Sequence, residues 1–179
     1  MPYPRVVSIA VLSLMGLATA NAQDHSAMDH QKHMAMMMTE DNRQLVAFPP
    51  PMREHTLANM RDHMQALSDI LTAMATAQYG EASRIADARL GMGSPAAEGC
   101  KSDGAGAAQM SMPASMEHQM SEIMPEGMRT IGLEMHQAAS AFATEAAKAS
   151  KTGEAKSALV ALSRVTRQCS ACHTAYRVQ

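Results

Sequence analysis

Two cysteines and a histidine near the C-terminus form a C-x-x-C-H motif, made by Cys169, Cys172 and His173 in the stretch RQCSACHTAYRVQ. This spacing is the one at which proteins attach c-type haem. On a helix the two cysteines are neighbours, and His173 lies one turn beyond Cys169. Two thioether bonds can then hold the porphyrin edge while the imidazole binds the iron. The motif predicts one covalent haem c per chain, with His173 as an axial iron ligand.

Three other chemistries use a similar pair of cysteines. A thioredoxin-like site needs a helix N-terminus to lower the pKa of one thiol, whereas this pair lies near the end of a predicted helix and no βαβ pattern surrounds it. A zinc site needs two more ligands, for which only Cys100 and a histidine are available. A structural disulfide would be strained across adjacent helical turns and leaves His173 without a role. Haem attachment is therefore favoured, and the alternatives stay open.

The first 22 residues have the features of a secretory signal. Arg5 precedes an apolar run over 6–18 that is too short to span a bilayer, and small residues at Ala20 and Ala22 predict cleavage after Ala22. The remaining chain has 14 Lys and Arg (15 less Arg5) against 17 Asp and Glu, a balance that argues against a nucleic-acid partner. We expect a periplasmic protein without a membrane span that meets other periplasmic redox proteins.

Histidine and methionine crowd the segment after the signal, and we expect residues 23–51 to form a disordered tail. After cleavage, Gln23 to His25 would present an amine, two backbone amides and an imidazole, a set suited to Cu(II). The soft thioethers that follow favour Cu(I). Copper is thus a second candidate cofactor, with His25, His30, His33, Met34 and Met36 as candidate ligands. A solvated tail without function is an equal alternative.

Helical periodicity runs through the rest of the chain, with apolar residues recurring at spacings of three and four. It predicts helices over 52–78, 81–91, 115–150 and 154–177, with a Gly- and Ser-rich loop over 93–113. In the first helix the expected core stripe includes Leu67 and Leu71. Such helices favour an all-α domain over 52–179, an antiparallel four-helix bundle. With 19 methionines and no Trp, either thioethers fill its core or a bulky non-protein group replaces the missing rings.

The stretch CSACHTAYR, at 169–177, resembles the C-terminal signature of the class II c-type cytochromes, the cytochrome c-prime family. REHTLANMRDHM, at 53–64, is similar to the first helix of that family. The resemblance covers roughly 52–92 and 126–177. It implies a left-handed four-helix bundle around one haem, with His173 as the proximal ligand and Arg53 near a haem propionate. It also makes Arg177, which closes the signature, a haem-binding candidate.

The same resemblance places Leu57, four residues after Arg53, over the distal face of the haem. Leucine cannot ligate iron, so we expect a five-coordinate site open to small neutral ligands. A shift of register would bring Met60 to the iron as a sixth ligand, or the ring of His63. His136 is another histidine that could approach a haem edge.

These features favour an electron carrier over two other functions, a haem protein that binds NO or CO and a copper-handling protein that uses the tail. No nucleophile motif, phosphate loop or spaced acid pair points to an enzyme. Cys100 is the odd thiol once haem takes the other two. It could stay free, bind a metal or pair with a second chain in a homodimer.

Overall fold

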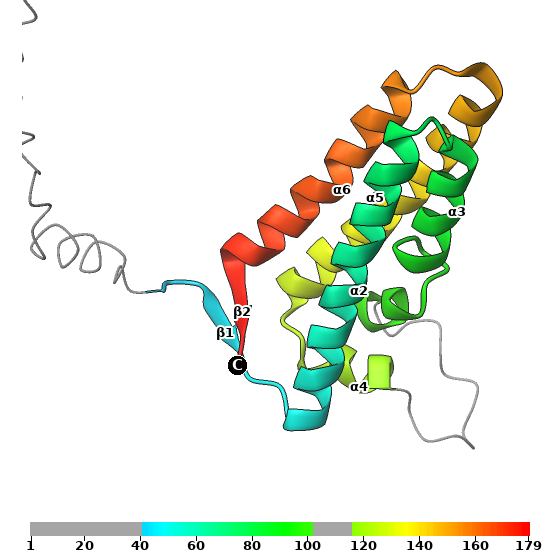
Figure 1. Ribbon diagram of the computed structural model, residues 1–179. Helices are drawn as coiled ribbons and strands as arrows, with labels where there is room; N and C mark the ends of the chain where they lie inside the picture. The colour runs from blue at the N-terminus through cyan, green and yellow to red at the C-terminus, as the bar shows by residue number, and fades with distance from the viewer. Residues whose placement is uncertain (1–40, 102–115) are drawn as a thin grey trace, which may run out of the picture. The chain divides into compact units, whose positions relative to one another are not determined.

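The computed structural model describes residues 41–101 and 116–179, and these are mainly helical, as the sequence predicts (Figure 1). The α-helices are α2 (Pro50–Ala75), α3 (Tyr79–Arg89), α4 (Met116–Ile123), α5 (Glu126–Thr152) and α6 (Lys156–Ala175), with a 3-10 helix, η1 (Pro95–Cys100), between α3 and α4. None of the helices in these residues has the length and apolar character needed to cross a membrane.

Proline and glycine set several of the helix boundaries. Proline opens α2 at Pro50, where the missing N–H would have had no intrahelical partner. The segment expected to be helical over 115–150 is two helices, α4 and α5, with the break at Pro125 that its proline predicts, because Pro125 has an extended backbone and cannot continue α4. Gly153 ends α5 with a φ of +75°, and its N–H bonds to the carbonyl of Ala149.

Two short strands join the segment before α2 to the segment after α6. Strand β1 (Gln44–Val46) pairs in parallel with β2 (Tyr176–Val178), so that the C-terminus lies beside the entry to α2 (Figure 1). Val46 and Phe48 are buried. The compact unit begins at Asn42, ten residues before the boundary that we expected at residue 52. A three-residue strand whose partner is far away in sequence leaves no periodic signal.

The main core lies where α5 packs along α6 and α3, and where α2 packs on α3. It is built largely from alanines, with Ile70, Phe142 and Leu162 as its larger side chains. Ile70 is fully buried, whereas Leu71, which the sequence placed in the core, is 50% exposed. The buried stripe of α2 is thus turned by about one residue from the predicted stripe, because alanines such as Ala66 face the core.

A second apolar cluster lies around the C-terminal end of α6. It joins Val46 and Phe48 to three methionines, Met120, Met124 and Met128, and packs against Cys172 and Tyr176. Thioethers thus fill much of this cluster, which agrees with the predicted use of methionine as core filling.

Candidate functional site

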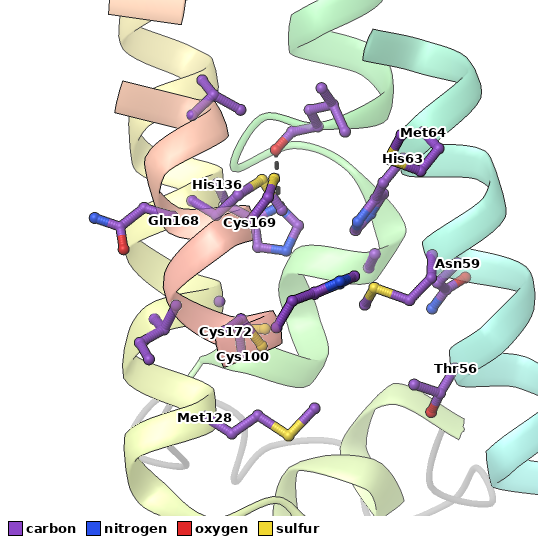
Figure 2. A pocket seen from close by; sticks show the side chains of 18 of the residues that line it. Thr56, Asn59, His63, Met64, Cys100, Met128, His136, Gln168, Cys169 and Cys172 are labelled. Carbon is purple, nitrogen blue, oxygen red and sulfur yellow. Dashed lines mark hydrogen bonds between the residues drawn. The ribbon is translucent and has the colours of Figure 1, made fainter. Parts of the chain in front are cut away.

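The three residues of the C-x-x-C-H motif line a single cavity of about 300 Å³ (Figure 2). Cys169, Cys172 and His173 project from the last two turns of α6, and most of the other lining side chains are apolar. α2 forms part of the lining as well. In the described residues the backbone of α2 lies close to that of α3 along much of its length, whereas it approaches the backbone of α6 at few points if any. The cavity therefore separates α2 from the end of α6 that carries the motif.

The end of α6 is held by the chain that precedes α2. Arg43 donates a hydrogen bond from Nη1 to the backbone carbonyl of His173 at 3.3 Å. Directly after α6, Tyr176 pairs with Gln44 in the parallel ladder. A carbonyl in the last turn of a helix has no intrahelical partner, so the arginine satisfies one that would otherwise need water. Residues that the sequence assigned to the tail thus position the motif.

The predicted distal residues are only partly in the cavity. Met60 lines it, but Leu57 does not, and Arg53 is exposed and also outside the lining. The α2 residues that line the cavity are Thr56, Asn59, Met60, His63, Met64 and Leu67. Leu57 lies at the edge of this stripe, and most of the α2 side chains that line the cavity follow it in the sequence.

The other predicted site residues lie away from the cavity or outside the described part of the chain. Arg177 is half-buried in β2, in register with Leu45. The candidate copper ligands of the tail, His25, His30, His33, Met34 and Met36, fall outside the described residues.

The motif thiols are held in their protonated form. Burial raises the pKa of Cys169 and of Cys172, and for Cys172 the neighbouring Cys169 adds to the rise. A thioredoxin-like pair needs the opposite shift, because its nucleophile is a thiolate. The environment therefore argues against a thiol–disulfide oxidoreductase site.

Cys100, for which the sequence left several roles open, lines the same cavity from η1. Burial and the nearby Cys172 raise its pKa to about 11. Its sulfur packs against α5 at Gly132, where an added Cβ would come within 2.5 Å of Sγ. Glycine at 132 thus makes room for this thiol. All three cysteines are free thiols, and nothing in the spacing of Cys100 predicted that they would meet.

Two histidines meet at the upper end of the cavity, where Figure 2 shows both rings beside Cys169. His136, which is fully buried on α5, forms a hydrogen bond from Nδ1 to the carbonyl of Leu90 at 2.7 Å. The ring of His63 meets it edge-on, with centroids 5.8 Å apart and an interplanar angle of 82°. Burial, and then the field of His136, lower the pKa of His63 to about 4. Burial also lowers the pKa of His136. Both rings are neutral near pH 7.

Ion pairs hold the α2 wall of the cavity to its neighbours. Arg89 of α3 bonds to Asp62 and, at 2.8 Å, to Asp69, and the pKa of Asp62 is lowered by this hydrogen bond. His55 bonds to Glu117 of α4 at 2.8 Å. Each such pair at the surface contributes little to stability. Together they link α2 to α3 and α4 beside the cavity.

No family model matches the chain, and neither a curated protein nor a solved structure matches it.

Proposed function

We propose that this protein is an exported c-type cytochrome that carries one haem on Cys169 and Cys172 and passes single electrons to periplasmic redox partners. The observation that carries this proposal is the convergence of both thiols and the adjacent imidazole of His173 on one largely apolar cavity. Its volume of about 300 Å³ falls at the lower end of the range of about 300–1,000 Å³ for ligand sites.

The side chains present fit a covalently held haem. Both motif cysteines are free, and His173 is an exposed imidazole at the rim of the same cavity. Haem supplies the one-electron iron couple when it is bound. The chain's own part is to hold the porphyrin edge through two thioethers, to bind the iron through His173, and to keep water away with the apolar walls. The exclusion of water from the iron is one of the factors through which a protein sets the reduction potential of its haem.

We further propose that α2, α3, α5 and α6 form the four helices of a bundle of the kind found in class II c-type cytochromes. Support comes from the packing of α5 on α3 and α6, and of α2 on α3. The motif lies in the last helix, as the resemblance implies, and the α2 wall takes the place of the first helix. Helix α4 and the strand pair would then be additions around the haem end.

Extraction of the haem tests this proposal. The chain is exported in a host that matures c-type cytochromes, denatured, and washed with acidified ketone. A covalent haem should stay with the polypeptide. Cys172→Ser should lose one thioether bond, whereas Cys100→Ser, a matched change at a thiol in the same cavity, should keep both. Haem that washes out of the unaltered chain contradicts the proposal.

A further inference from the structure

The α2 wall offers three side chains with an atom able to bind iron, Met60, His63 and Met64. The three side chains differ in their exposure to solvent. Met64 is 62% exposed, so most of its thioether faces solvent. Met60 and His63 are half-buried and line the cavity. The choice of a ligand from α2 is therefore between a thioether and an imidazole that are three residues apart on one face of the helix.

The buried nitrogen of His63 distinguishes it from Met60. Within the described residues, Nε2 of His63 is shielded from water and has no hydrogen-bond partner. A buried polar atom left in this way costs about 1–3 kcal/mol. The sulfur of Met60 carries no such cost, because a thioether is a weak hydrogen-bond acceptor that packs favourably against apolar side chains. A bond to a metal would remove the cost at Nε2, and the nitrogen belongs to a side chain that lines the same cavity as His173.

The ring of His63 is also held in place before any ligand arrives. It meets the ring of His136 edge-on at 5.8 Å between centroids, and His136 is in turn fixed by its hydrogen bond to Leu90. The adjacent residue, Asp62, bonds to Arg89 of α3 and so links this turn of α2 to α3. An imidazole with a fixed orientation loses little entropy on binding a metal.

We propose that His63 is the second axial ligand of the haem iron, so that the iron is bound by two imidazoles, from α6 and from α2. This inference rests on the proposed function, because it needs the haem on Cys169 and Cys172. It replaces the five-coordinate site expected from Leu57. An iron closed by two neutral imidazoles keeps the same ligands in both redox states and excludes NO and CO, so it serves electron transfer rather than gas binding.

Spectroscopy of the haem-loaded, full-length protein tests the ligand. The ferric protein should be low-spin with the near-infrared signature of two imidazoles and without a methionine-to-iron charge-transfer band. His63→Leu should convert most of the iron to the high-spin form and raise the affinity of the reduced protein for CO roughly tenfold or more, since an internal ligand no longer competes. Met60→Leu, the matched change one turn earlier, should keep the low-spin spectrum of two imidazoles.

A second variant covers the case in which His63→Leu does not fold. His63→Met keeps a ligating side chain and should stay low-spin while gaining a methionine charge-transfer band. The proposal is overturned by a high-spin ferric spectrum in the unaltered protein, by a methionine band that vanishes in Met60→Leu, or by a spectrum of two imidazoles that survives in His63→Met. A chain that carries no covalent haem overturns the proposed function as well, and its mass alone reveals that outcome.

Discussion

The proposed haem can be tested through stability, because a chain without it should keep a void in the site whose cost can be worked out from the cavity volume. The double variant Cys169→Ala, Cys172→Ala removes both points of attachment. Residual cavities in protein cores cost about 24 cal/mol for each Å³. For about 300 Å³ the product is about 7 kcal/mol, an upper limit because the cavity is partly open and admits water. Domains have only about 5–15 kcal/mol of stability.

We therefore expect the haem-free double variant to be close to unfolding at room temperature. Urea titrations followed by far-UV circular dichroism, run beside the haem-loaded protein, give the difference in free energy of unfolding. Cys100→Ala is the matched control, since it removes a sulfur from the same cavity but leaves both points of attachment, and it should cost about 1 kcal/mol. A double variant as stable as the haem-loaded protein would refute the reasoning, because the cavity would then close by itself at no cost.

Three further predictions concern acid, a glycine and the tail. In the haem-free Cys169→Ala, Cys172→Ala variant the pKa of His63 is lowered to about 4, so the folded chain binds fewer protons than the unfolded chain between about pH 6.5 and 4. Stability present above pH 6.5 should be lost across this window, by up to about 3 kcal/mol, and adding His63→Leu should give a flatter profile in urea titrations. Gly132→Ala gains about 1 kcal/mol of helix propensity inside α5, but its methyl group meets Cys100, so the substitution should be more favourable by about 1 kcal/mol in a Cys100→Ala background than in the unaltered chain; equal effects in the two backgrounds contradict this packing. Copper titration of the mature chain against a variant that starts at Asn42, which keeps β1, should show uptake by the mature chain alone, and equal uptake would eliminate the tail as a copper site.

The helices were predictable because they are long and periodic, and because prolines and glycines mark their ends. Pro50 and Gly153 act at α2 and α5 as the sequence suggests. The rotation of α2 was not predictable, because a search for large apolar residues assigns Leu71 rather than Ala66 to the core. Helices that approach closely need small side chains between them. The alanines of α2 therefore face the core, and Leu71 is 50% exposed.

The motif was predictable from spacing alone, but its surroundings were not. Cys169, Cys172 and His173 are contiguous in sequence, so the chemistry that they share can be inferred before any fold is known. Cys100 and His136 reach the same cavity only through the packing of η1 and α5. Arg43 reaches the end of α6 through a strand pair that joins the two ends of the compact unit. Contacts of this kind depend on the tertiary structure, and a single sequence carries no local trace of them.

The intact mass of the exported protein under denaturing conditions tests the central claim most directly. The mature chain is expected to begin at Gln23 and to carry the added mass of one haem, retained after denaturation and assigned by fragmentation to Cys169 and Cys172. A denatured chain with the mass of the polypeptide alone, or with the two hydrogens lost in a disulfide between these cysteines, would contradict it.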